Sequence, residues 1–217
     1  MKHFQRHTLS EIQALSLQHF EQISTRILFQ ITNNRFSLRK LLLEVPENAT
    51  LFSQCIHYDA VDKIVLWDSF DQKIQLRLHI YSSLDDKTIS STQIDTEDPH
   101  NHRWNFTSLI LSGGYQHTIY KEDFLTHRLT PIMIRRERLG DCYTLHHSQF
   151  HSIVREPNTV TILFRGPQEK DRFQTIKGDS CALKRDAFED PAFKKQRALG
   201  RKEFDLLLER LKTLQII

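Results

Sequence analysis

The chain has 217 residues, 39% of them hydrophobic, which is enough for one sizeable core. Its 30 Lys and Arg against 27 Asp and Glu give a net charge of +3 that is spread along the chain, unlike the concentrated basic patch of a nucleic-acid-binding protein. No stretch is apolar enough for a membrane span or signal peptide, and three widely spaced cysteines form no disulfide framework, so we expect a cytoplasmic protein that binds neither membrane nor nucleic acid.

A helical pattern opens the chain. Across residues 9–27 apolar side chains recur every three or four positions, which predicts an amphipathic helix. A shorter helix is expected from about Ser37, because three leucines follow at 41–43. We therefore expect residues 1–61 to form a helical extension that packs on the domain that follows.

From about residue 62 the pattern changes to short runs rich in β-branched and aromatic residues, separated by turn-forming residues. The runs are KIVLW, KIQLRLHIYS, SLILSGGYQHTIY, TPIMIRRERL, DCYTLHH, HSIV and TVTILFRGP. Many short strands favour an antiparallel sandwich or barrel, which we place at residues 62–167. The basic run RRER, residues 135–138, contains its own acid and is typical of a solvated strand face.

The pattern changes again after Pro167. The segment DPAFKKQRALGRKEFDLLLERLKTLQII is typical of a helix, a break at Gly200 and a second helix. Residues 168–217 are thus expected to be a C-terminal helical extension. The second helix carries an apolar stripe, which predicts packing on the barrel wall, with a homodimer seam as the alternative. The stripe is formed by Phe204, Leu207, Leu208, Leu211 and Leu214.

Two histidines flank one asparagine in DPHNHRWNF, residues 98–106. On a strand His100 and His102 point to one face, because side chains alternate with a period of two. By the same alternation Trp104 should point with the histidines, whereas Arg103 should point away and form an outer salt bridge. Two imidazoles on one face can bind a metal; the alternative is a polar strand edge. The continuation RWNF fits neither HxHxDH nor HxHxH metal and hydrolase motifs, and the chain contains no HExxH, so strand-borne histidines of a β-barrel remain.

These motifs resemble those of the cupin superfamily, whose jelly-roll barrels carry HxH on one strand and a third histidine in a second motif. In GDCYTLHHSQFH, residues 140–151, Gly140 and His151 keep the spacing of that second motif. His146 and Ser148 replace its proline and second glycine.

The resemblance covers roughly residues 62–167. Together with the flanking helical patterns it implies a mainly β protein, a cupin-like double-stranded β-helix (jelly-roll) barrel with N-terminal and C-terminal helices. It also implies a metal site, whose ligands would be His100, His102 and His151. His146 and His147 are the substitutes for the third ligand.

The first motif lacks the glutamate that cupins place four or five residues after the second histidine, because Phe106 and Thr107 stand there. A divalent metal on three neutral imidazoles keeps its full charge and about three open positions, which favours an anionic co-ligand from the substrate. In this respect the chain is similar to cysteine-dioxygenase-like thiol dioxygenases, which read LxGxLxE where this chain has LSGGYQH. That resemblance implies Fe(II), O2 as co-substrate and a small anionic substrate; Zn, Ni and Mn are the other metals considered.

Other residues of that branch are not matched. Its substrate-binding arginine falls near residue 64, where this chain has Lys63 and Ile64, and its crosslinking cysteine is Thr107 here. Its catalytic tyrosine and nearby histidine fall on Arg165 and Leu163. These differences argue against a true cysteine dioxygenase.

Four further residues are candidates for catalysis or substrate orientation. In KIQLRLHIYS, Arg77 and His79 share one strand face with Tyr81. A barrel lined with such polar side chains can bind a small anion. The alternative is that this face meets water. Arg165 is a further candidate for anion binding, since a guanidinium can bind a carboxylate through two hydrogen bonds. For His117 three roles remain open, namely a fourth ligand, an acid or base in the pocket, and a hydrogen-bonded structural histidine.

Three functions follow as hypotheses. The first is a mononuclear non-haem iron oxygenase or dioxygenase that acts on a small anion with O2. The second is a non-oxidative cupin isomerase, epimerase or lyase, in which a metal polarises a carbonyl or a histidine moves a proton. The third is a non-catalytic cupin that binds a small molecule. Three histidines without a carboxylate favour the first.

Overall fold

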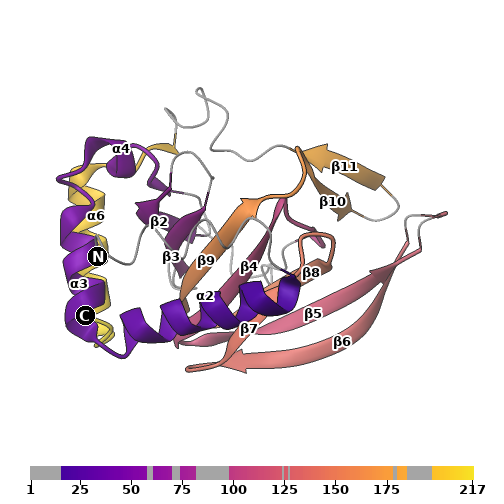
Figure 1. Cartoon of the computed structure of the whole chain (residues 1–217), viewed down its shortest axis with the longest axis horizontal. Coiled ribbons are helices and arrows are strands. Elements are labelled where there is room, and N and C mark those ends of the chain that lie inside the picture. Colours follow the sequence, from indigo (N-terminus) through magenta and orange to yellow (C-terminus); the bar gives the residue numbers. More distant parts are fainter. Residues whose placement is uncertain are drawn as a thin grey trace.

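The computed structural model describes residues 16–57, 61–69, 74–81, 98–123, 125–126, 128–177, 180–184 and 197–217. This part of the chain is mainly β, with two antiparallel sheets that enclose a core and helices that cover the larger sheet (Figure 1). The mainly β class predicted from the short strand-like runs is therefore confirmed.

Each N-terminal helix begins at a residue whose side-chain oxygen accepts a hydrogen bond from a free backbone N–H. These capping residues are Ser16, Asn34 and Asn48. The helices described are α2 (Leu17–Thr32), α3 (Arg35–Glu44), α4 (Ala49–Phe52) and α6 (Arg201–Thr213). The start of the first predicted helix, residues 9–15, lies outside the described residues, and α4 was not predicted. None of the helices described is long and apolar enough to cross a membrane.

The larger sheet has the strand order β1-β2-β3-β9-β4-β7, and the smaller sheet has the order β6-β5-β8. In the larger sheet the strands are β1 (Ile56–His57), β2 (Val61–Asp68), β3 (Gln75–Tyr81), β9 (Val160–Gln168), β4 (Trp104–Ser112) and β7 (Cys142–Leu145). In the smaller sheet they are β6 (Leu129–Arg138), β5 (Gly114–Glu122) and β8 (Phe150–Arg155). Each predicted run coincides with a strand, except that the run SLILSGGYQHTIY spans both β4 and β5.

That run is divided at Gly113, which has a φ of 62°. A side chain is disfavoured in this left-handed conformation, so glycine provides the turn of the β4–β5 hairpin. A second hairpin, β10 (Phe173–Lys177) and β11 (Ser180–Lys184), follows the barrel. It was not predicted, because residues 168–217 were expected to be helical. The first helix expected there begins at about residue 190, and its part at residues 190–196 lies outside the described residues.

The strand order is that of a jelly roll. His100 forms an antiparallel bridge with His151 of β8, so the segment around His100 adds an outer member to the smaller sheet. The chain then passes from β3 to this segment, to β4, to the β5–β6 pair, to β7, to β8 and to β9, crossing between the two sheets. This is the double Greek-key path of a jelly-roll barrel.

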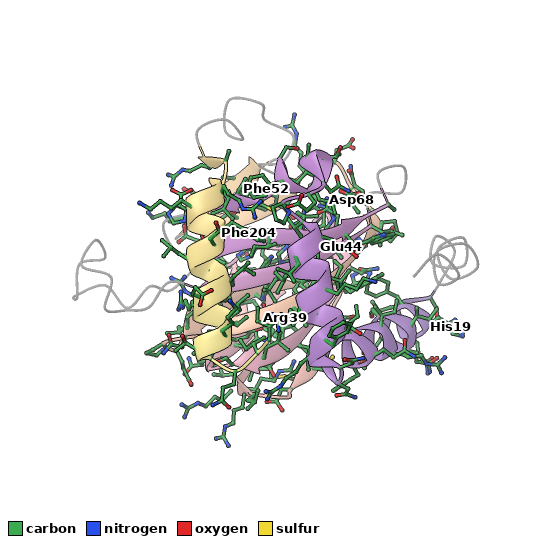
Figure 2. All side chains as sticks on the ribbon, turned by 90° about the vertical axis from the view of Figure 1, so that its left-hand side faces the viewer. His19, Arg39, Glu44, Phe52, Asp68 and Phe204 are labelled. Atoms are coloured by element: carbon green, nitrogen blue, oxygen red, sulfur yellow. The ribbon has the colours of Figure 1, made fainter. Side chains whose placement is uncertain are left out.

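Alternation along β3 separates two cores. Leu76, Leu78 and Ile80 belong to the core between the larger sheet and the helices, whereas Tyr81 belongs to the core between the two sheets. The stripe of α6 packs into the helix-side core, where Phe204 lies against Phe52 with ring centres 5.7 Å apart (Figure 2). The stripe of α6 therefore packs on the barrel wall within the chain, while the homodimer stays a prediction.

Candidate metal centre

Three histidines from two neighbouring segments meet at the inner core of the barrel. His100 and His102 precede β4, and His151 is the second residue of β8. One ring nitrogen of each lies within 4.8 Å of the others, and among the described residues this cluster could hold a metal ion. His151 is buried, whereas His100 and His102 are half-buried. The site thus has an inner side and a side that solvent reaches.

The backbone explains why these residues meet. The N–H of His100 donates to the carbonyl of His151 and the N–H of His151 donates to the carbonyl of His100, both at 2.9 Å. Residues paired in this way present their side chains to the same face, and His102 follows two positions later on that face. The ring centres of His102 and His151 are 5.0 Å apart, and their Nε2 atoms are 2.7 Å apart.

Burial determines the charge of these rings. It lowers the pKa of His102 and of His151 well below the usual histidine value, and the nearby His100 lowers both further. Both imidazoles are therefore neutral at neutral pH, which is the form that binds a metal. In His100, Nδ1 lies 3.0 Å from the carbonyl oxygen of Asp98. Because a carbonyl only accepts, Nδ1 carries a proton, which leaves Nε2 as the nitrogen of this ring that can bind a metal.

A buried cationic wall lies beside the histidines. The guanidinium carbons of Arg165 and Arg77 lie 4.3 and 5.5 Å from the ring centre of Trp104, whose ring is 6.2 Å from that of His102. Arg77 also donates from Nε to Oε1 of Gln75 at 2.6 Å. Arg77, Arg165, Gln75 and Trp104 are buried and His79 is half-buried, so this strand face lies largely inside the barrel rather than in water.

His79 extends the same wall. It lies opposite Lys63 in the β2–β3 register, so both side chains are on the face of Arg77. Burial, followed by the charges of Lys63 and Arg77, lowers the pKa of His79 well below its usual value. Its buried Nε2 has no hydrogen-bond partner among the described residues. A buried polar atom of this kind needs an explanation, and a ligand that accepts or donates a hydrogen bond would supply one.

His117 lies behind His151 rather than within the three-nitrogen cluster. Its Nε2 is 3.0 Å from Nδ1 of His151, the nitrogen on the far side of the ring from His102, and its Nδ1 is 3.0 Å from Oε1 of Glu137. Of the three roles left open by the sequence, this geometry favours a hydrogen-bonded histidine over a fourth ligand.

Two other candidates for the third ligand lie outside the cluster. His146 and His147 stack on each other with ring centres 4.1 Å apart. His146 contacts the hydroxyl of Ser148 at 2.8 Å through Nδ1, and His147 contacts Oδ1 of Asn105 at 3.2 Å. The structure therefore brings His151, not these two residues, to His100 and His102.

Glu137 is the residue near the site that the sequence analysis misjudged. The run RRER was expected to be a solvated strand face, but Glu137 is buried and accepts hydrogen bonds from Arg135 and His117. The signal available was the alternation of β6, which places Arg135 and Glu137 on one face. Arg103 points away from the cluster as expected, and its Nε donates to the carbonyl of Lys170 at 3.2 Å.

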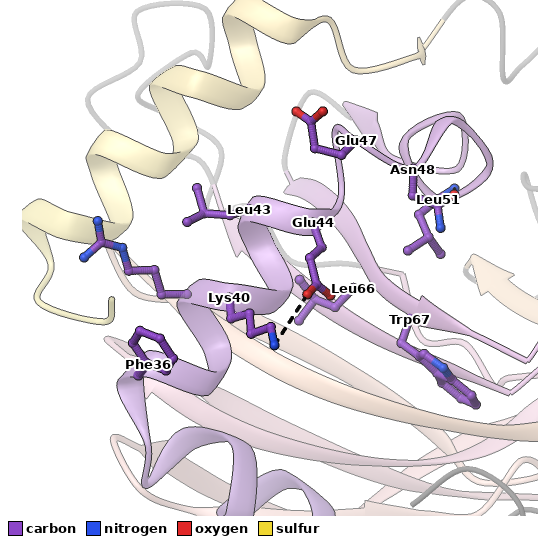
Figure 3. Close-up of a pocket in the computed structure, with 10 residues that line it drawn as sticks. Phe36, Lys40, Leu43, Glu44, Glu47, Asn48, Leu51, Leu66 and Trp67 are labelled. Atoms are coloured by element: carbon purple, nitrogen blue, oxygen red, sulfur yellow. Dashed lines mark hydrogen bonds and ion pairs between the residues drawn. The ribbon is translucent and has the colours of Figure 1, made fainter. Parts of the chain in front are cut away.

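A groove of about 700 Å³ lies elsewhere, on the outer side of the larger sheet beside α3 and α4 (Figure 3). Phe36, Leu43 and Trp67 contribute to its apolar walls. Lys40 and Glu44 form a 4.0 Å ion pair at its edge. It shares no residue with the histidine cluster or the cationic wall, so this groove is separate from the candidate metal centre.

No family model matches the chain, and no curated protein sequence matches it. Solved structures of cupin-fold proteins do match. KdgF from Halomonas sp. is 14% identical over 52% of this chain and 85% of its own, with a TM-score of 0.36. An RmlC-like cupin from Shewanella frigidimarina is 12% identical over 54% of this chain and 86% of its own, with a TM-score of 0.37. An oxalate oxidase is 14% identical over 44% of this chain and 43% of its own, with a TM-score of 0.31. At these values the likeness concerns the fold and carries no argument about activity.

Proposed function

We propose that this chain is a metal-dependent cupin enzyme, an Fe(II) oxygenase or dioxygenase that acts on a small anionic substrate with O2. The observation that carries the proposal is the cluster of three imidazole nitrogens within 4.8 Å, with no carboxylate in the cluster among the described residues. Imidazole ligands suit Fe, Zn, Cu and Ni, so the donor set fits a transition metal better than Mg²⁺ or Ca²⁺.

The electrostatics of the cluster fit a cation. Two Nε2 atoms of neutral rings, those of His102 and His151, face each other at 2.7 Å. In the metal-free chain one of these rings carries its proton on Nε2 and donates to the other, and a bound metal ion would take the place of that proton. Three neutral ligands leave the charge of a divalent ion uncompensated, which favours a negatively charged substrate in the same site.

The cationic wall supports an anionic substrate independently of the metal. Arg77 and Arg165 would bind its negative group and orient it, and His79 would donate or accept the hydrogen bond that its Nε2 lacks among the described residues. Trp104 lies against both arginines and 6.2 Å from His102 between ring centres, so it would help to exclude water from the space beside the cluster. When bound, Fe(II) would supply the electron transfer to O2, while these residues bind the substrate and fix its position.

A second candidate function is proton transfer without oxygen, as in an isomerase or lyase. The observation that favours it is His79, a neutral, half-buried imidazole on the face of the arginines whose buried Nε2 has no hydrogen-bond partner among the described residues. Such a group can take a proton from a substrate that the arginines hold. The two functions differ in whether turnover requires O2.

Elemental analysis of protein purified without an affinity tag tests the proposal. The wild type should contain close to one iron per chain after anaerobic Fe(II) addition, and the variants His100→Ala and His151→Ala should lose it while staying folded. His146→Ala is the matched control, because this histidine is close in sequence but outside the cluster. Metal retained by both cluster variants, or bound by none of the proteins, would refute the metal site. If the site binds iron, a measurement of oxygen uptake with thiol and carboxylate compounds separates the two functions, because only the oxygenase requires O2.

A further inference from the structure

A line of three buried side chains crosses the smaller sheet from β6 through β5 to β8. Oε1 of Glu137 lies 3.0 Å from Nδ1 of His117, and Nε2 of His117 lies 3.0 Å from Nδ1 of His151. The three residues are 4%, 0% and 5% exposed. Because β6, β5 and β8 are adjacent strands, the line runs across the inner face of the sheet and ends at the histidine cluster.

The carboxylate end fixes the direction of the hydrogen bonds. An ionised carboxylate only accepts, so the proton between Glu137 and His117 is on Nδ1 of His117. If the ring of His117 carries only this proton, its Nε2 accepts, and Nδ1 of His151 is the donor, which the NMR measurement below tests directly. The proton of His151 is therefore on Nδ1, and its Nε2 keeps a lone pair. This Nε2 is the atom 2.7 Å from His102.

We propose that His117 and Glu137 are positioning residues that hold His151 in the tautomer and ring orientation needed to bind a metal. The inference rests on the proposed function, because it concerns the same site. Metal-binding histidines commonly donate their second N–H to a carboxylate or carbonyl, which orients the ring and strengthens it as a ligand. Here a second histidine is inserted between the ligand and the carboxylate, so the negative charge acts on His151 through the ring of His117.

Arg135 completes the arrangement from the outer side. Its Nε donates to Glu137, and its guanidinium carbon lies 5.2 Å from the ring centre of Tyr143. A buried carboxylate needs such a partner, since an unpaired buried charge is strongly unfavourable. Glu137 thus accepts from Arg135 on one side and from His117 on the other, which explains why an acid is buried in a strand that is otherwise largely exposed.

The test compares two variants of the line with one control. His117→Phe keeps a ring of similar size but removes both hydrogen bonds, and Glu137→Gln keeps an oxygen acceptor but removes the charge. The control is Tyr115→Phe, which also removes a buried polar group from β5; the Tyr115 hydroxyl lies 2.6 Å from that of Tyr143 and takes no part in the line. Two quantities are measured, namely Co(II) affinity by titration of the visible absorption, and the proton position on His151 by ¹⁵N NMR of the metal-free protein.

In the wild type the NMR signals should place the His151 proton on Nδ1. His117→Phe should move it partly to Nε2 and weaken Co(II) binding by about 10- to 100-fold, the usual effect of losing an outer partner of a ligand. Glu137→Gln should weaken binding less while keeping the proton on Nδ1, and Tyr115→Phe should change neither quantity. A structural role alone would alter stability but not the proton position.

Unchanged Co(II) affinity in folded His117→Phe protein, or a wild-type His151 proton on Nε2, would overturn the inference. If His117→Phe does not fold, Glu137→Gln decides: the same Co(II) affinity as Tyr115→Phe counts against the line. If the wild type binds no Co(II), the proposed metal function fails, whereas the NMR measurement on the metal-free protein still supports or refutes the hydrogen-bonded line.

Discussion

The cationic wall makes a prediction about substrate charge that can be tested at Arg165. This side chain is buried against Trp104, with its guanidinium carbon 4.3 Å from the ring centre. Away from solvent, the charge-assisted hydrogen bonds that it makes to a carboxylate are weakly screened. Hydrogen bonds to charged groups contribute about 1.5–3 kcal/mol, so Arg165→Met should weaken carboxylate binding by about 10- to 150-fold.

The assay compares two thiols of similar size on Co(II)-loaded protein, mercaptoacetate with a carboxylate and 2-mercaptoethanol without one. Wild-type protein should bind mercaptoacetate more tightly, and Arg165→Met should abolish most of that difference while leaving the affinity for 2-mercaptoethanol unchanged. Arg136→Met is the control, because Arg136 is an exposed arginine paired with Glu156 at 2.6 Å on the surface. An equal preference for mercaptoacetate in Arg165→Met and wild-type protein would refute the assignment of this wall to the substrate anion.

Two further predictions concern stability. Burial lowers the pKa of His79, His102 and His151 in the folded chain, so only the unfolded chain takes up these protons as the pH falls below about 6.5. The free energy of unfolding of the metal-free protein should therefore fall by up to about 1.4 kcal/mol per pH unit for each histidine. Urea unfolding between about pH 7.5 and about pH 5 should show this fall, and His79→Phe should show a less steep one. A flat profile would contradict the burial of these rings. At Gly113, with φ 62°, an added Cβ would lie 2.8 Å from Cα of Thr159, whereas at Gly140, with φ 89°, it would meet nothing within 4 Å. Gly113→Ala should therefore lower the free energy of unfolding by about 2–4 kcal/mol, and Gly140→Ala by about 1–2 kcal/mol. Urea unfolding measures both values, and equal losses would show that the contact with Thr159 is unimportant.

Local alternation predicted those parts of the site that lie on one strand. The pattern of KIQLRLHIYS separates Leu76 and Leu78 from Arg77 and His79, and in the structure the leucines belong to the helix-side core while Arg77 and His79 lie on the other face of β3. His100 and His102 share a face for the same reason. Such predictions need no knowledge of the partner strand, because the side-chain period is a property of the extended backbone itself.

Features that depend on strand neighbours could not be predicted in this way. Glu137 is separated from His117 by twenty residues of sequence, and their contact depends on the register of β5 with β6. Hydrophobic patterning fixes register only through the face that is buried, and most residues of β6 are exposed on both faces. Alternation within RRER places Arg135 and Glu137 on one face, but without the partner strand it does not show that this face is the inner one.

The position of Glu137 also bears on why the site would select anions. The acid is directed at the cluster, yet the rings of His117 and His151 stand between it and the cluster, and Arg135 offsets its charge from the other side. In the larger sheet Arg77 and Arg165 lie against Trp104, whose ring centre is 6.2 Å from that of His102. A ligand bound to the three histidines would thus be separated from Glu137 by two imidazole rings. On this proposal the acid would strengthen His151 as a ligand without facing the substrate anion, because its influence is passed through hydrogen bonds rather than through open space.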